Sequence, residues 1–208
     1  MKVMLVNGSP HKDGCTNRAL AEIATTLAEN GVESDIFWIG TKPLAGCIAC
    51  GTCATTGRCV FNDRVNEFLA VAPTYDGFVF GSPVYYAGMA GAMKCFMDRA
   101  FYADGANSFY LKPVAGIASA RRAGTTATWD EFNKYFGIKQ MLTVGSQYWN
   151  MVHGGKAADV EQDAEGLQTM RTLARNMAYL LKSLEAGRAA GVELPAVEPV
   201  HQWTNFIR

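Results

Sequence analysis

Residues 1–31, MKVMLVNGSPHKDGCTNRALAEIATTLAENG, carry a strand, a polar loop and a helix in close succession. Lys2 to Val6 is a short apolar run that ends in Gly-Ser-Pro, which is typical of a buried strand. From Asn17 to Glu29 the apolar residues return at helical spacing, and Asn30-Gly31 follows as a stop signal. A strand that passes through a short loop into a helix predicts the first unit of an α/β fold.

The same alternation continues along the chain. We expect further strands at 35–39, 77–80, 113–118 and 140–144, and further helices at 64–72, 89–100 and 128–136. A last helix is predicted by an apolar stripe from Leu167 to Leu184, with a capping box at Asp159 and Gln162 and an end at Gly187. Alternating β and α elements predict a parallel sheet with helices on both faces. Five strands fit a flavodoxin-like, doubly wound three-layer sandwich of strand order 2-1-3-4-5, in which ligands bind beyond the carboxyl ends of the strands.

The length of 208 residues suits one domain, which we expect over residues 1–187 with a Cys-rich loop at 44–63. Residues 188–208 hold two prolines and the aromatics Trp203 and Phe206, so we expect an extended tail that could pack on a neighbouring subunit. Lys+Arg and Asp+Glu both number 19, so the chain lacks the basic excess that binds nucleic acid. Since no run of about 18 apolar residues predicts a membrane helix and the amino-terminal run is too short for a signal peptide, we expect a cytoplasmic protein.

The loop GSPHKDGC, residues 8–15, lies between the first strand and the first helix. Free N–H groups at a helix N-terminus attract phosphate, and Ser9, Thr16 and Asn17 can add side-chain donors. The loop is neither a Walker A motif nor a Gly-x-Gly-x-x-Gly turn, and no acidic residue closes the second strand to hold an adenosine ribose. A mononucleotide phosphate therefore fits better than a dinucleotide. The alternative is an ordinary βα loop rich in turn residues.

Two further loops fall at the matching places: GSPVYYAGM, residues 81–89, after the third strand, and SARRAGT, residues 119–125, after the fourth. With Gly8-Ser9-Pro10 and Thr16-Asn17 they resemble the NAD(P)H-dependent FMN reductase branch of the flavodoxin-like superfamily. The resemblance implies FMN, with the Pro-x-Tyr segment lining the isoalloxazine ring, and no catalytic side chain because the flavin carries the chemistry. The family usually has Arg or Lys where this chain has His11, and routine packing is the alternative for the tyrosines. The implied cofactor-binding residues are Ser9, His11, Cys15, Thr16, Asn17, Pro83, Val84, Tyr85, Tyr86, Gly88, Ser119 and Gly124.

Four of the six cysteines share one loop, with the spacing Cys47-x2-Cys50-x2-Cys53-x5-Cys59. Thiolates this close can converge on one metal centre, and the first three resemble the run that holds iron–sulfur clusters in bacterial ferredoxins. Zinc, a redox disulfide or free thiols are the alternatives. The segment is similar to the compact motif of iron–sulfur flavoproteins in the same superfamily, which implies a [4Fe–4S] cluster beside the FMN. Cys95 falls inside a predicted helix and is expected to be a small core residue.

Three functions remain open. The first is an FMN-dependent oxidoreductase in which a [4Fe–4S] cluster passes electrons to or from FMN, linking a donor such as ferredoxin to a two-electron acceptor. The second is a cluster-free FMN or quinone reductase with NAD(P)H as the donor. The third is a zinc-stabilised binding protein. The aromatic, glycine-bounded loop from Tyr148 to Gly155 has two interpretations, the substrate side of the flavin or a subunit interface, and the interface is favoured. Together with the aromatic tail, this loop favours a homodimer or homotetramer.

Overall fold

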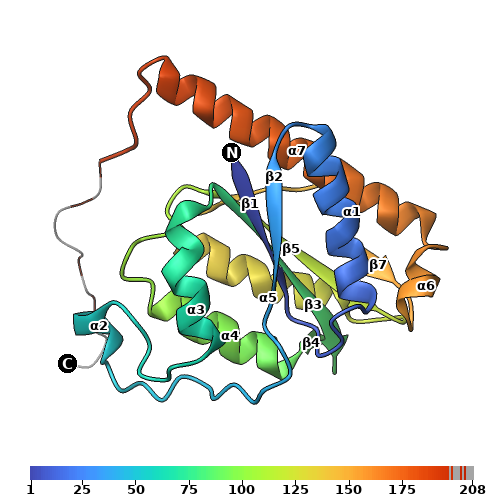
Figure 1. Ribbon diagram of the computed structural model, residues 1–208, viewed down its shortest axis with the longest axis horizontal. Coiled ribbons are helices and arrows are strands. Elements are labelled where there is room, and N and C mark those ends of the chain that lie inside the picture. Colours follow the sequence, from blue (N-terminus) through green and yellow to red (C-terminus); the bar gives the residue numbers. More distant parts are fainter. Residues whose placement is uncertain (197, 199–201, 203, 205–208) are drawn as a thin grey trace.

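The computed structural model describes residues 1–196, 198, 202 and 204, so Trp203 and Phe206 of the predicted tail lie outside the described residues. A parallel sheet forms the centre, with its strands in the order β2-β1-β3-β5-β6 (Figure 1). Four of these strands are β1 (Lys2–Asn7), β2 (Glu33–Trp38), β3 (Gly77–Tyr85) and β5 (Pro113–Ala120). The predicted doubly wound order 2-1-3-4-5 is confirmed.

The fifth position of the sheet is divided between two short strands. β6 (Leu142–Thr143) pairs with the start of β5, and β7 (Met151–His153) pairs with its end. The chain leaves the sheet between them because Asn150, which is buried, closes the loop: its Nδ2 donates to the carbonyl oxygen of Val144 at 3.5 Å. With β4 (Gly88–Met89), which pairs antiparallel with the end of β3, the described residues form seven strands and not the five predicted.

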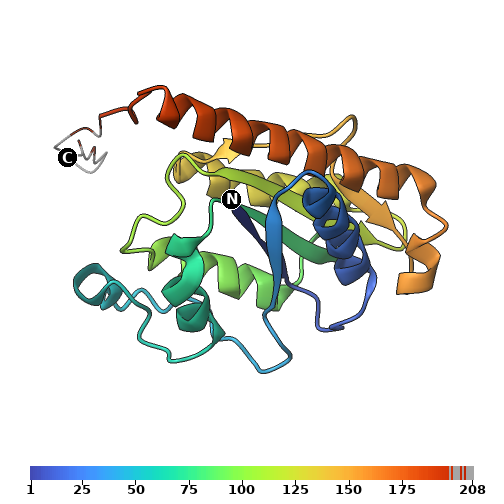
Figure 2. The same ribbon diagram turned by 45° about the horizontal axis from the view of Figure 1, so that its top comes forward.

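Helices cover both faces of the sheet (Figures 1 and 2). α1 (Cys15–Glu29) and α7 (Ala164–Ala189) share one face, and α3 (Arg64–Val71), α4 (Gly91–Tyr102) and α5 (Thr125–Ile138) share the other. The short helices η1 (Ala72–Thr74), α2 (Cys53–Thr56) and α6 (Ala157–Val160) lie in the connections. None of the helices in the described part of the chain is both long and apolar enough to span a membrane.

The start of the last helix differs from the predicted capping box. Asp163 is the N-cap of α7, and its carboxylate accepts a hydrogen bond from the N–H of Gly166 at 2.9 Å. Asp159 instead accepts from the N–H of Gly155 at 2.9 Å and closes the turn that precedes α6. Two acidic residues four positions apart thus cap two different helices, and the spacing alone does not distinguish them.

The end of the last helix also lies beyond the predicted stop at Gly187. α7 continues to Ala189, and Gly191 then adopts a positive φ of 86°. The N–H of Val192 turns back to the carbonyl oxygen of Gly187 at 2.9 Å, a common way to end a helix. The regular part of the domain therefore ends at Ala189, inside the segment predicted as tail.

Phe68 of α3 lies at the centre of an aromatic cluster on the α3–α4–α5 face. Its side chain is fully buried, and its ring centroid lies 5.1 Å from that of Phe96 in α4. The rings of Phe78 and Phe109 are both 6.1 Å away. Phe68 is the largest side chain that α3 buries, so with Val65 and Leu69 beside it this ring makes the main contribution to holding α3 on the sheet.

We predict that Phe68→Ala lowers the free energy of unfolding by about 3–5 kcal/mol, since it removes a large buried ring and leaves a cavity. Ile138→Ala is the control, because Ile138 at the end of α5 is 82% exposed; its effect should stay within about 0.5 kcal/mol. Urea unfolding followed by circular dichroism measures both. Equal stabilities for the two variants would contradict the central role of Phe68.

Candidate functional site

A cleft of about 720 Å³ lies at the carboxyl ends of β1, β3 and β5. Its walls come from the three loops that follow these strands, with a further wall from the segment after β7. Eight of the predicted cofactor residues line it: Ser9, His11, Cys15, Thr16, Pro83, Val84, Tyr85 and Ser119. The three loops that the sequence singles out therefore meet at one site, at the strand ends where ligands bind in such sheets.

The N-terminus of α1 opens into this cleft. Its N-cap is Gly14, which offers no side chain, and the first turn contains no acidic residue. The first N–H groups of a helix have no partner within the helix, and this end of α1 lies at the cleft, which Gly14, Cys15 and Thr16 line. Together with the positive end of the helix dipole these N–H groups make a suitable site for a phosphate group.

Asn7, the last residue of β1, holds the first loop in place through hydrogen bonds from its side chain to the loop backbone. Its side chain is fully buried: Nδ2 donates to the carbonyl oxygen of Lys12 at 3.1 Å, and Oδ1 accepts from the N–H of Ser9 at 3.0 Å. Trp38, at the end of β2, donates from Nε1 to the carbonyl oxygen of Ser9 at 2.7 Å. Sequence reasoning missed both residues. A polar residue at the end of an otherwise apolar strand was the available signal for Asn7.

The first and third loops are joined by a hydrogen bond between Thr16 Oγ1 and Ser119 Oγ, which are 2.8 Å apart. Gly81 makes this approach possible, because a Cβ there would lie 2.7 Å from Thr16 Cγ2. Gly124 has a φ of +92°, and a Cβ there would lie 2.8 Å from the Cα of Ala87 in the second loop. The three loops therefore support one another directly, and small residues are required where they touch.

Four predicted cofactor residues do not line the cleft: Asn17, Tyr86, Gly88 and Gly124. The side chain of Asn17 turns to Asn7, whose Nδ2 lies 3.5 Å from its Oδ1. Tyr86 is fully exposed at the tip of the β3–β4 hairpin, where its φ is +50°. Gly88 lies in β4, and Gly124 caps α5. These four residues therefore support the loops or lie at their edges, and they do not form the surface of the cleft.

The fourth wall of the cleft begins in the loop after the fifth predicted strand, for which the sequence favoured a subunit interface over the flavin side. It consists of Gly154, Gly155, Lys156 and Ala157, which follow β7. Cys15 donates from Sγ to the carbonyl oxygen of Gly154 at 3.3 Å and so ties this wall to the first loop. Burial raises the pKa of the Cys15 thiol, which favours the protonated form. Lys12 and Arg121 add positive charge to the lining.

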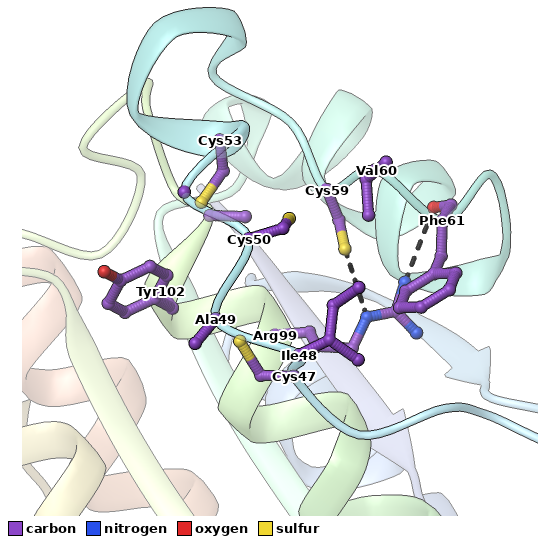
Figure 3. Close-up of a pocket in the computed structure, with 12 residues that line it drawn as sticks. Cys47, Ile48, Ala49, Cys50, Cys53, Cys59, Val60, Phe61, Arg99 and Tyr102 are labelled. Carbon is purple, nitrogen blue, oxygen red and sulfur yellow. Dashed lines mark hydrogen bonds between the residues drawn. The ribbon is translucent and has the colours of Figure 1, made fainter.

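The four cysteines of the predicted metal motif line a second, small cavity of about 20 Å³ (Figure 3). All four are free thiols; Cys47 and Cys50 are exposed, and Cys53 and Cys59 are half-buried. Ile48, Val60, Phe61 and Tyr102 give the cavity a mainly apolar wall. The four cysteines of the motif therefore share one pocket. Cys15, the first residue of α1, and Cys95, in α4, lie outside it.

The thiols are not gathered on a single point. Within the described residues, no three Cys, His, Asp or Glu side chains are close enough to hold one metal ion. Structural zinc needs such convergence, with four ligands around one ion. A [4Fe–4S] cluster is bound by four thiolates and has an iron atom for each of them, so its ligands stand around a larger group. Four thiols on an apolar cavity are a donor set of the kind that such a cluster uses.

Arg99 of α4 borders this pocket and was not foreseen. Its side chain is 1% exposed, and its two Nη atoms donate to the Asp63 carboxylate at 2.7 and 2.9 Å. Its Nε donates to Cys59 Sγ at 3.2 Å (Figure 3). Burial opposes the charge of Arg99, but the bonds to Asp63 and Cys59 outweigh this and raise its pKa above the ordinary value.

The cleft and the cysteine pocket lie at opposite ends of α4. The first loop, residues 8–15, packs near the start of α4, since a Cβ on Gly8 would lie 2.5 Å from Met93 Sδ. Arg99 and Tyr102, near the end of α4, line the cysteine pocket. From Met93 to Tyr102 the helix rises about 14 Å. In both views α2 lies on the opposite side of the molecule from α6 (Figures 1 and 2). Within one chain the pocket is therefore not beside the cleft.

Comparison with known proteins identifies relatives that match nearly the whole chain. Over 194 residues the chain is 30% identical to an iron–sulfur flavoprotein of Methanocaldococcus jannaschii, covering 89% of this chain and 100% of the relative. A second iron–sulfur flavoprotein of that organism is 29% identical over 196 residues, with 88% and 98% covered.

Solved structures share the fold at low sequence identity. RosB, solved with a bound intermediate, superposes with a TM-score of 0.69 at 12% identity, over 100% of this chain and 93% of that one. A WrbA-like flavodoxin of Agrobacterium tumefaciens gives 0.61 at 16% identity, over 88% and 96%. The family model for NADPH-dependent FMN reductases matches residues 1–156. The chain thus belongs to the NADPH-dependent FMN reductase family, in its iron–sulfur flavoprotein branch, and is an FMN-dependent oxidoreductase with a flavodoxin-like fold.

Proposed function

We propose that this oxidoreductase holds FMN in the cleft and a [4Fe–4S] cluster on Cys47, Cys50, Cys53 and Cys59, and that electrons pass between the two groups. The observation that carries the proposal is the assembly of all four thiols on one apolar cavity. The names of the two relatives, both iron–sulfur flavoproteins, support it. FMN exchanges electrons singly or in pairs and the cluster exchanges them singly, so the protein would connect a one-electron donor, such as a ferredoxin, to a two-electron acceptor.

The protein's own residues supply position and charge. The open N–H groups of α1 suit the FMN phosphate, with Ser9 and Thr16 beside them. Pro83, Val84 and the half-exposed Tyr85 form the wall against which a flavin ring would pack. No general acid or base is required in this proposal, because the flavin carries the chemistry.

A cluster-free reductase with NAD(P)H as the electron donor is the second candidate. It is favoured by the basic residues Lys12, Arg121 and Lys156 in the cleft, which could meet the phosphates of a nicotinamide nucleotide. The family description, which names NADPH, also supports it. Membership of an oxidoreductase family removes the support for a zinc-stabilised binding protein without redox turnover.

We further propose that the protein works as a homodimer or homotetramer. Helix α4 keeps the two sites too far apart for FMN in the cleft and a cluster in the cysteine pocket to touch within one chain. A second copy could bring a cysteine pocket closer to a cleft. Tyr148 and Trp149, about half exposed with ring centroids 4.8 Å apart, offer an aromatic surface of the kind that interfaces use.

For the FMN site, we predict that Thr16→Val weakens FMN binding by about 10- to 100-fold, the usual effect of losing a hydrogen bond to a charged group. The substitution keeps the shape of the side chain and removes the hydroxyl that meets Ser119 in the cleft. Thr26→Val is the matched control, because Thr26 is equally buried in the same helix and does not line the cleft. Quenching of FMN fluorescence on titration gives both affinities; equal affinities would mean that the phosphate lies elsewhere.

For the cluster, we predict about four irons and four acid-labile sulfides per FMN after anaerobic reconstitution. Changing Cys47, Cys50, Cys53 or Cys59 to Ser should each labilise the cluster, because three thiolates leave one iron open to water and oxygen. FMN should remain bound in all four variants. Cys15→Ser and Cys95→Ser are the controls and should keep the iron. A wild type that takes up no iron yet reduces quinones with NADPH would favour the second candidate.

For the assembly, we expect a mass of two or four chains by light scattering at micromolar concentration. Replacing both Tyr148 and Trp149 by Ser should shift the distribution toward smaller species, because the exposed aromatic pair is the surface proposed to pack against another copy. A wild-type protein that stays monomeric would refute this proposal.

A further inference from the structure

Arg99 joins both ends of the cysteine loop to α4. Before the cysteines, its Nη1 donates to the carbonyl oxygen of Ala45 at 3.3 Å; after them, its Nη2 donates to the carbonyl oxygen of Phe61 at 3.4 Å. The guanidinium also lies over the Phe61 ring, 4.8 Å from its centroid, and forms the two bonds to Asp63 described above. A buried guanidinium is costly unless its donors are used, so these contacts indicate a built support for the loop.

Arg99 forms a hydrogen bond with the sulfur of Cys59 but not with those of the other three cysteines. Within the described residues, no charged side chain donates a hydrogen bond to the sulfur of Cys47, Cys50 or Cys53, whereas Arg99 donates to that of Cys59. Asn66 of α3 holds the backbone of Cys59 as well: its Oδ1 accepts from the N–H, and its Nδ2 donates to the carbonyl oxygen, both at 2.9 Å. Cys59 is therefore fixed on three sides, while Cys47 and Cys50 lie exposed on the outer part of the loop.

We propose that Arg99 is a positioning residue of the cysteine pocket, which fixes Cys59 and both ends of the loop before any metal arrives and raises the reduction potential of a bound cluster. The potential is expected to rise because reduction adds negative charge to the cluster, and hydrogen bonds to its sulfur ligands stabilise that charge. The statement about the potential rests on the proposed function, but the statement about the loop does not. Cys59 is thus inferred to keep a fixed position, whereas the more exposed Cys47 and Cys50 adjust their positions when a cluster binds.

The first experiment uses the FMN-bound protein without iron and measures hydrogen–deuterium exchange in the variants Arg99→Lys and Arg99→Gln. Amides in residues 45–63 should exchange at least about tenfold faster than in the wild type, because the hydrogen bonds from the guanidinium to both loop ends are lost. Amides of α7 should keep their wild-type rates, which verifies the fold. Lysine retains a charge beside Asp63, so Arg99→Lys provides the result if Arg99→Gln fails to fold.

Arg58→Gln is the matched control. Arg58 lies in the same loop and donates to Asn62 Oδ1 at 3.2 Å, but its side chain is exposed and bonds to no cysteine. Exchange in residues 45–63 should be close to wild type in this variant. Unchanged exchange in a folded Arg99→Lys or Arg99→Gln protein would overturn the positioning role.

The second experiment measures the reduction potential of the cluster after anaerobic reconstitution. Arg99→Lys should have a lower potential than the wild type, and Arg58→Gln the same potential. An unchanged potential in Arg99→Lys would overturn the electronic part of the inference. A wild type that binds no iron would overturn that part together with the proposed function, and the exchange rates alone would then decide whether Arg99 positions the loop.

Discussion

Parallel pairing brings the ends of β1, β3 and β5 to the same edge of the sheet. In this register Asn7 lies opposite Gly81, and Pro83 lies opposite Ser119. Three loops from distant parts of the sequence must therefore leave the sheet side by side, which forces close contact among them. The contact is relieved by glycine at Gly81 and stabilised by the bond between Thr16 and Ser119. The shape of the cleft thus follows from strand register together with a few small or polar residues at the strand ends.

The position of the three cofactor loops could be predicted because each one directly follows a strand with a clear apolar pattern. The fourth wall was harder to assign, since its glycines follow β7, which has only three residues and no detectable period, and the sequence favoured an interface there. Asn7 and Trp38 were also beyond sequence reasoning in their detailed roles. Their hydrogen bonds depend on how the first loop folds back on the sheet, which local propensity does not determine.

The cysteine motif shows a similar division between local and long-range information. Its spacing is local, so the grouping of Cys47, Cys50, Cys53 and Cys59 in one pocket was predictable. Arg99 lies 40 residues beyond Cys59, in a helix whose pattern indicated only a buried face. A charged residue within an apolar helical stripe was the one available hint, because burying a charge is costly and usually serves a purpose.

Helix α4 connects the cleft to the cysteine pocket. Its first turn packs against the first loop, residues 8–15, through Met93, and its last turn holds the cysteine loop through Arg99. A single helix packed on a sheet by Phe96 and Met97 is stiff, so the two sites keep a fixed separation within one chain. That stiffness has a functional consequence: bending the domain is a poor way to shorten the path between the two groups. Under the proposed function, rapid electron exchange between FMN and a cluster would then depend on how copies of the chain are arranged.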